Sequence, residues 1–448
     1  MKNNSLTAMV FFLFVSFSFA VSALAAEKTF TLEQCLDMAR ERNPAILASL
    51  EKKVQAQWSK QAAYDDFLPK LNMDYGYTYI DEVTNINADF VNIDEVSVTM
   101  HNNYQMALHI DQPLFTGFRL METYHLAELG LKEAVAGEEL ADLEIIYQTV
   151  SAYYNLLLAM KYQEVMDSTV IELTSHYNDS QQFYKNEIIP LNDLLESEVH
   201  LSNAIDNAKT AKSNVSNAKR VLLTIIKEPV NLDFTVVDSP DDLPLTSDAE
   251  ILAQRALEIR PELKQANYGL EASRKQVNIA RSAYYPTLML SATHNRYGGD
   301  ILVDGHGLSD LQRPEENMIG VYASWEIFAW GQTNHRVNAA NAASRQAQQQ
   351  LIKVMDEIQL EVRNNFTNAV TSYSNIATSR KAVEQALENL RMNTVRYKNQ
   401  IATSSDVLDA QTLLTKTKNY YYRAIYNYNI WLAALARSVG VKSWKELN

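Results

Sequence analysis

The sequence predicts a mostly α-helical chain that contains one structural unit twice, with two β-strands in each copy. Three observations predict this fold. Residues recur at a constant offset of 213 positions, two long stretches near 119–183 and 333–396 lack proline and keep a helical pattern, and four short segments alternate between apolar and polar residues. An offset of this kind indicates a duplicated unit, and the two other patterns distinguish helix from strand.

The first 25 residues have the composition of a secretory signal peptide. Lys2 is followed by an apolar run over 9–21 and then by Ala23-Leu24-Ala25. A positive start, a short apolar core and an Ala-x-Ala site are the three parts of such a peptide. The run is also too short to span a bilayer as a helix. We therefore expect residues 1–25 to be removed and the protein to be exported.

Composition limits the function further. The formal charge of −14 argues against a nucleic-acid partner, because phosphates require a basic surface. Glycine and proline number 12 and 10 among 448 residues, which favours long helices. The single cysteine, Cys35, is expected to be a small buried thiol.

The duplication is clearest in a polar segment. Tyr184-Lys185-Asn186-Glu187-Ile188 recurs as Tyr397-Lys398-Asn399-Gln400-Ile401, and Phe115 and Phe328 keep the same offset. Two unrelated amphipathic helices would share scattered leucines but not this polar run. The predicted organisation is a first repeat over 26–227, a linker over 228–247, a second repeat over 248–440 and a C-terminal tail over 441–448.

Each repeat contains two segments with strand-like alternation. They lie near 70–80 and 103–114 in the first repeat, and near 287–297 and 318–328 in the second. About 9–11 residues is the length of a tilted strand that crosses a bilayer. A soluble sheet with one buried face is the alternative. If the strands do span a membrane, several copies must join, because four strands cannot close a barrel and lipid does not tolerate open edges.

The helical segments are expected to form two long hairpins. Their turns are predicted near 185–192 and 398–405, and each returning helix carries a heptad pattern. The repeated positions are Leu194, Leu201, Ala208, Val215 and Leu222 in the first repeat, and Val407, Leu414, Tyr421, Tyr428 and Leu435 in the second. Residues that recur every seven positions over four heptads indicate that two helices pack together. A free-standing coiled coil would explain the helices but not the strands.

Taken together, these features resemble the TolC-like outer membrane efflux proteins over nearly the whole mature chain. The segment from Tyr397 to Gln411 is similar to that family's second periplasmic turn, and 113–117 and 327–331 are similar to its strand-to-helix junctions. The resemblance implies a homotrimer in the outer membrane, with a twelve-stranded transmembrane barrel continued by a helical periplasmic tunnel. It also implies a periplasmic adaptor protein, an inner-membrane pump, and a role in efflux or type I secretion.

The same resemblance assigns roles to individual residues. Four acidic residues are expected at a periplasmic gate: Asp406, Asp409, Asp193 and Glu196. Six residues are expected at the hairpin tips and at the adaptor contact: Tyr184, Glu187, Ile188, Tyr397, Gln400 and Ile401. Four are expected at the strand-to-helix junctions: Phe115, Gly117, Phe328 and Gly331. Glu187 and Gln400 stand where many members of the family have glycine.

Two alternatives remain open for the acidic residues. Asp406 and Asp409 are three residues apart and share a helix face, so three copies would gather six carboxylates. Asp193 and Asp406 also lie where helices are expected to begin, and helix capping accounts for them without a gate. Tyr184 and Tyr397 are expected either to link neighbouring hairpins or to pack within a tip.

Other functional classes fit the sequence less well. Its eight histidines lack metal-ligand spacing, and it has neither a glycine-rich phosphate loop nor a nucleophile motif, so we expect no enzyme activity and no cofactor. A passive porin would carry many more strands in one chain. A structural periplasmic coiled-coil protein is the other alternative. The sequence does not identify the exported substrate, the adaptor or the pump.

Overall fold

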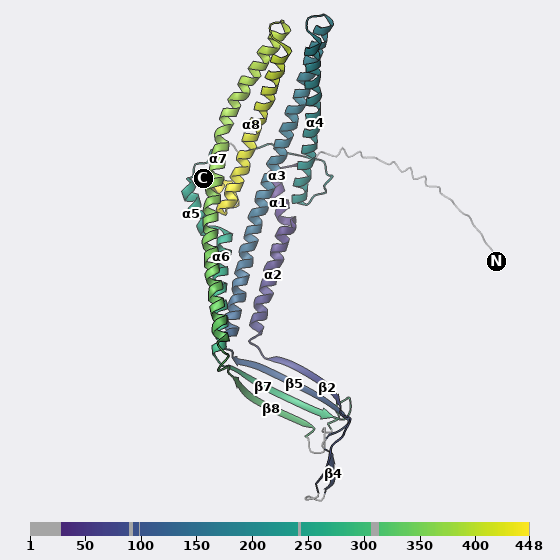
Figure 1. Cartoon of the computed structure of the whole chain (residues 1–448), viewed down its shortest axis with the longest axis vertical. Coiled ribbons are helices and arrows are strands. Elements are labelled where there is room, and N and C mark those ends of the chain that lie inside the picture. Colours follow the sequence, from purple (N-terminus) through teal and green to yellow (C-terminus); the bar gives the residue numbers. More distant parts are fainter. Residues whose placement is uncertain (1–27, 89–92, 98, 241–242, 306–312, 448) are drawn as a thin grey trace, which may run out of the picture.

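A computed structural model describes residues 28–88, 93–97, 99–240, 243–305 and 313–447. The molecule is strongly elongated, with a β-sheet at one end and two helical hairpins whose turns lie at the other (Figure 1). The fold is dominated by helices, as predicted. The expected signal peptide lies outside the described residues.

The first repeat contains two short helices, two long ones and most of the strands. Its elements are β1 (Lys28–Phe30), α1 (Leu32–Arg42), α2 (Pro44–Asp65), β2 (Lys70–Tyr79), β3 (Asn85–Ala88), β4 (Ile93–Ser97), β5 (Asn102–Phe115), α3 (Arg119–Lys185) and α4 (Leu191–Ile226). The two glycines of α3, Gly130 and Gly137, do not interrupt it.

The second repeat has the same order of main elements. After β6 (Phe234–Val236) come α5 (Ala249–Ile259), α6 (Pro261–Arg281), η2 (Ser282–Tyr284), β7 (Thr287–Gly298), β8 (Glu315–Ser324), α7 (Gln332–Lys398), α8 (Ser404–Val439) and η3 (Trp444–Leu447). Helices α3 and α7 both have 67 residues, and α4 and α8 both have 36. At 1.5 Å per residue, each of the longer pair extends for roughly 100 Å.

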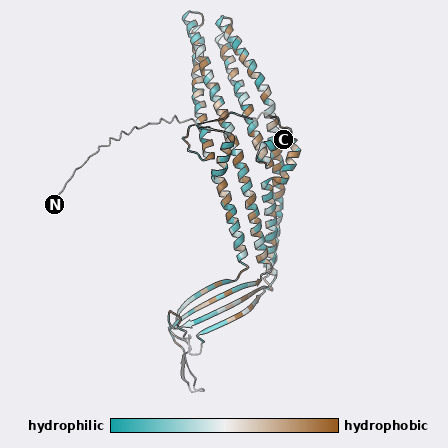
Figure 2. Ribbon diagram, turned by 180° about the vertical axis from the view of Figure 1, so that it is seen from behind, coloured by the Kyte–Doolittle hydropathy of each residue, from teal (hydrophilic) through white to brown (hydrophobic). Residues whose placement is uncertain are grey.

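Among the described residues, four strands pair antiparallel in the order β2-β5-β7-β8. One face of the sheet carries Leu71, Met73 and Tyr75 of β2 beside Met106, Leu108 and Ile110 of β5. The opposite face carries Asn72, Asp74, His109 and Asp111. Hydropathy alternates along the strands accordingly (Figure 2). Strands β2 and β8 form the two edges of this sheet.

The eighth strand is shorter than predicted at its C-terminal end. We expected it near 318–328, but residues 325–329 are not in a strand. The register gives the reason. Ser324 pairs with Thr287, the first residue of β7, and Pro286 precedes it, so 325–328 have no strand beside them within the described part of the chain.

The linker and the C-terminal tail are both more ordered than predicted. Inside the expected linker, β6 pairs in parallel with β1, and Phe234 packs on Phe30 with ring centroids 5.3 Å apart. In the expected tail, η3 places Leu447 in the core at 1 % exposure. Both segments lie halfway along the molecule, beside α1 and α5 (Figure 1).

The central core lies around this β1–β6 pair. Cys35 is fully buried, as predicted, and burial raises the pKa of its thiol to about 12. Tyr153 donates its hydroxyl to the carbonyl oxygens of Phe30 and Val237, at 3.2 and 2.7 Å. These two hydrogen bonds attach α3 to the end of β1 and to the residue that follows β6.

An ionic cluster joins the repeats next to this core. Arg260 is 4 % exposed, and its guanidinium donates to Glu262 at 2.9 Å and to Glu361 at 2.5 Å. Arg437 donates to Glu361 at 2.7 Å and to Glu144 at 2.8 Å. These five residues come from α3, α7, α8 and the α5–α6 corner, so this cluster ties both repeats together.

None of the described helices combines the length and the apolar character that crossing a membrane requires.

Candidate gate and contact residues at the hairpin tips

Both hairpin turns have the same backbone. Ile188 donates its amide to the carbonyl of Phe183 at 2.9 Å, and Ile401 donates to Arg396 at 2.8 Å. Between them, Glu187 and Gln400 adopt φ of 58° and 59°. Both isoleucines are exposed, at 42 % and 68 %. The tips therefore present an apolar side chain beside a left-handed residue, a conformation that glycine adopts at low cost.

Replacing Gln400 with glycine is expected to stabilise the folded protein by about 1 kcal/mol, because glycine removes the steric cost of a left-handed Cβ. Thermal unfolding in detergent measures the change. The matched control is Gln349→Gly in the exposed interior of α7, which is expected to destabilise by a similar amount. Equal destabilisation by both variants would show that the turn does not favour glycine.

The two hairpins meet along a polar seam near the tips. Ser180 and Tyr397 share a hydrogen bond between their hydroxyls at 2.8 Å, and the Nε2 of His176 lies 2.9 Å from the Ser404 hydroxyl. Further from the tip, Thr169 and Thr415 are 3.0 Å apart. We call these three pairs the hairpin seam. Hydroxyl and imidazole groups exchange partners with water at small cost, so this seam is weaker than an apolar one.

Two of the seam residues have shifted pKa values. The pKa of His176 is lowered to about 4, chiefly by burial; Asp179 raises this pKa, and His200 lowers it. Burial also raises the pKa of Tyr397, against the hydrogen bond from Ser180. His176 is 6 % exposed and Tyr397 is 3 % exposed. The seam is thus built for a neutral imidazole and a neutral phenol.

The two tip tyrosines differ although the sequence repeats them. Tyr397 packs on His176 and Phe183, with ring centroids 4.9 and 5.3 Å away, and it links the hairpins of one chain. Tyr184 is 39 % exposed. Within this chain, the linking role that we considered for both tyrosines is therefore seen at Tyr397.

The four expected gate residues also differ from one another. Asp406 completes a capping box on α8, accepting from the Thr403 amide at 2.8 Å while the Thr403 hydroxyl accepts from the Asp406 amide at 3.3 Å. The hydrogen bonds from Thr403 lower the pKa of Asp406. Asp409 is exposed one turn later.

The capping prediction for Asp193 is wrong. Helix α4 begins after Pro190, and within the described structure no side chain caps it. Asp193 is the third residue of α4 and is partly exposed, as is Glu196. Proline provides the fixed φ but not the hydroxyl that Thr403 offers at the other tip, which is why the box forms at only one of them.

The two strand-to-helix junctions have the same left-handed backbone conformation, but glycine comes first at one junction and second at the other. Gly117 and Phe118 have φ of 61° and 69°, and their counterparts Trp330 and Gly331 have 52° and 80°. A Cβ on Gly117 would lie 2.4 Å from the Ser282 carbonyl oxygen, so only glycine fits there. The rings of Phe115 and Phe118 meet edge to face, with their centroids 5.3 Å apart. At the second junction, Phe328 and Trp330 are 70 % and 88 % exposed.

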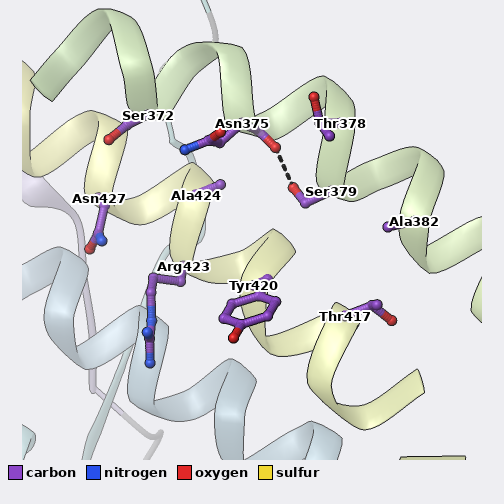
Figure 3. A pocket seen from close by; sticks show the side chains of 10 residues that line it. All are labelled: Ser372, Asn375, Thr378, Ser379, Ala382, Thr417, Tyr420, Arg423, Ala424 and Asn427. Carbon is purple, nitrogen blue, oxygen red and sulfur yellow. Dashed lines mark hydrogen bonds between the residues drawn. The ribbon is translucent and has the colours of Figure 1, made fainter. Parts of the chain in front are cut away.

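A groove of about 440 Å³ runs between α7 and α8 towards the middle of the molecule (Figure 3). Hydroxyl and amide side chains line it, with Ser372, Asn375 and Ser379 from α7 facing Tyr420 and Arg423 from α8. A second groove, of about 420 Å³, lies between α8 and the first hairpin and shares Tyr420 and Arg423. Both grooves run between helices, and their exposed lining is more apolar than polar.

Sequence reasoning did not find His176, Ser180, Ser404 or Thr403. The first two belong to a stripe on α3 with Thr169 and Leu173, spaced four, three and four residues apart. This spacing is typical of a helix-packing seam, and polar residues within it were the available signal. Thr403 three residues before Asp406 was the signal for a capping box.

Comparison with known proteins identifies the family. The model of the family described as outer membrane efflux protein matches residues 35–226 and 252–441, one stretch in each repeat. The chain belongs to this outer membrane efflux protein family. The efflux protein is 24 % identical over 428 residues to the outer membrane protein TolC of Escherichia coli strain K12, covering 93 % of this chain and 83 % of the relative.

Solved structures show the same fold. The outer-membrane channel OprN superposes with a TM-score of 0.78 at 17 % identity, over 92 % of this chain and 90 % of OprN. The Campylobacter jejuni CmeC outer membrane channel gives a TM-score of 0.77 at 19 % identity, over 91 % and 85 %. This efflux protein is therefore an exit channel of an efflux or secretion system, located in the outer membrane with its helical part in the periplasm.

Proposed function

We propose that three copies of this chain join edge to edge into one pore. Twelve strands would form a barrel in the outer membrane, and the hairpins would continue it as a tunnel through the periplasm. The observation that carries this proposal is the sheet itself. Among the described strands, β2 and β8 each pair on one side only, and their apolar face suits lipid. Open edges are unstable in lipid, so another copy must cover them.

The strand directions support closure. The order β2-β5-β7-β8 is antiparallel throughout, so β8 of one copy runs antiparallel to β2 of the next. The polar face, with Asn72, Asp74 and His109, then lines the lumen. Twelve strands leave an aqueous channel through which a passenger moves passively.

We further propose that the hairpin tips gate the tunnel and contact a periplasmic adaptor, which couples the channel to an inner-membrane pump. Ile188 and Ile401 are exposed at the turns and provide an apolar contact surface. The hairpin seam, held by hydroxyl and imidazole contacts, is where the hairpins separate on opening. Asp409 is exposed beside it, and threefold symmetry multiplies its charge.

The assembly is tested by fractionation and mass. We expect the protein in the outer-membrane fraction as a heat-modifiable trimer that conducts ions in planar bilayers. A soluble periplasmic monomer would exclude the proposed pore, and a trimer without conductance would support a structural role instead.

Replacing Asp409 with asparagine is expected to raise the concentration of a trivalent cation that half-blocks the channel by roughly tenfold, which equals about 1.4 kcal/mol of binding free energy. Removing three carboxylates from the entrance weakens the attraction for cations. Single-channel recording with the cation on the periplasmic side measures the effect.

Two variants control for this result. Glu33→Gln changes an exposed carboxylate on α1, away from the tips, and should leave the block unchanged. Asp406→Ala removes the acceptor of the Thr403 capping contacts and should alter stability more than block. If Asp409→Asn and Glu33→Gln behave alike, Asp409 lies outside the conducting path.

A further inference from the structure

Because the chain is duplicated, each contact between its two repeats has a corresponding helix face elsewhere in the chain, and that face is exposed. Within one chain, the first repeat meets the second where α3 packs on α6 and on α8. The counterparts of α3, α6 and α8 are α7, α2 and α4. The outer faces of these three helices are open in one chain, although the same faces of their counterparts are covered.

Ion pairs form the internal contact between α3 and α6. Lys264 on α6 lies 2.8 Å from Glu139 on α3, and Lys275 lies 2.9 Å from Glu122, which is 8 % exposed. The counterparts follow from the sequence. Helix α2 aligns with α6 through Pro44 and Pro261, and α7 aligns with α3 at the offset of 213.

Three of the four counterpart positions hold apolar residues, and the fourth, the counterpart of Glu122, is His335. Leu47 corresponds to Lys264, and Ile352 corresponds to Glu139. These two are 47 % and 45 % exposed, and Trp58, the counterpart of Lys275, is 69 % exposed. A leucine, an isoleucine and a tryptophan at the positions of charged contact residues indicate a protein-covered surface rather than a solvated one.

The hairpins show the same relation nearer the tips. Leu408 on α8 is 1 % exposed and packs on Leu173 and Ala204 of the first hairpin. Its counterpart Leu195 on α4 is 49 % exposed. The groove in Figure 3 is the corresponding face of the second hairpin. Five of its lining residues are the counterparts, at the offset of 213, of residues that line the covered groove. In order, Asn375, Ser379, Ala382, Thr417 and Tyr420 correspond to Tyr162, Met166, Thr169, Ala204 and Asn207.

We propose that the next copy of this chain covers these faces, with its Leu47 against Ile352 and its α4, carrying Leu195, along the groove between α7 and α8. The inference rests on the proposed trimer and specifies its contact. The junction between copies is apolar at three of the four positions where the junction within a copy is ionic, and the fourth is His335. It is also directional, because one copy offers α2 and α4 and its neighbour receives them on α7 and α8.

Thiol crosslinking in membranes tests the proposed contact. In a Cys35→Ala background, chains carrying only Leu47→Cys are expressed together with chains carrying only Ile352→Cys and treated with a short bismaleimide. We expect a linked dimer when both chains are present and only monomer when either is expressed alone. The double variant Leu47→Cys/Ile352→Cys should give linked dimers and trimers.

Two matched pairs calibrate the reaction. Glu139→Cys/Lys264→Cys replaces the internal ion pair and should link within one chain, seen as a crosslinked peptide without a change of mass on a gel. Lys52→Cys with Ile352→Cys places the first thiol on the far side of α2 and should not link, because positions 47 and 52 lie well apart around a helix.

The outcomes separate this inference from the trimer itself. The mass of the uncrosslinked variants in detergent shows whether they are trimers. A trimer in which Leu47 and Ile352 fail to link, while the internal pair does, refutes this contact and leaves the trimer intact. A monomer refutes both.

Discussion

Replacing Arg260 with alanine is expected to lower the free energy of unfolding by about 3 kcal/mol or more, the cost of removing one partner from a buried ion pair. Arg260 is 4 % exposed and holds two carboxylates, Glu262 and Glu361, within 2.9 Å of its guanidinium. Without it these carboxylates repel each other, and Arg437 alone remains to neutralise them. Thermal unfolding of the purified protein in detergent measures the loss.

The matched control is Arg363→Ala. Arg363 also pairs with a glutamate from another helix, Glu250, at 3.1 Å, but both side chains are about half exposed. Exposed pairs contribute about 0–1 kcal/mol, so this variant should unfold close to the wild-type temperature. If the two variants unfold alike, the buried ion pairs of Arg260 stabilise the protein no more than an exposed pair does.

The second large effect is a loss of stability in mild acid that depends on His176. Its pKa is about 4 in the folded protein, against 6.5 in an ordinary histidine. Above pH 6.5 the imidazole is neutral in both states and its contribution is complete. As the pH falls from 6.5 towards 4, the unfolded chain binds a proton that the folded tip excludes, so stability decreases, by roughly 3 kcal/mol at most.

The groups around His176 set the size of this effect. Asp179 favours the imidazolium but is itself paired with Lys398 at 3.4 Å, and His200 opposes it. We expect the thermal midpoint of the wild type to fall more between pH 7.5 and 5 than that of His176→Gln, which cannot titrate. His200→Gln, at a partly exposed position, should follow the wild type. Parallel curves for the wild type and His176→Gln would remove His176 as the cause.

Much of the architecture was predictable because its signals are local and repeated. The long helices follow from proline-free periodic stretches, and the four strands of the sheet from alternation. The duplication was readable because Tyr397 and its neighbours repeat a polar run. Nonlocal pairing was not predictable, since β1 and β6 are three-residue strands about 200 positions apart in a segment that looks like a linker.

The candidate site was harder to predict, because the role of each residue depends on whether its side chain is buried. Tyr184 and Tyr397 have the same sequence context, yet one is 39 % exposed and the other 3 %. The difference arises from their neighbours. Tyr397 faces Ser180 and His176 of the same chain, whereas the side chain of Tyr184 is exposed. The two repeats share residues, but within one chain the corresponding positions do not have the same neighbours.

In the proposed trimer, the ionic cluster around Arg260 would be the point about which the hairpins tilt. Helix α8 runs unbroken for 36 residues from Ser404 at the tip to Val439, and Arg437 lies near its end, so roughly 50 Å of helix separates the cluster from the tip. A tilt of about 5° at the cluster would displace the tip by roughly 4 Å, and three copies that tilt outward together would widen the proposed entrance by about twice that distance. On this proposal, a small change of side-chain contacts near the middle of the molecule would become a larger change of aperture at its end.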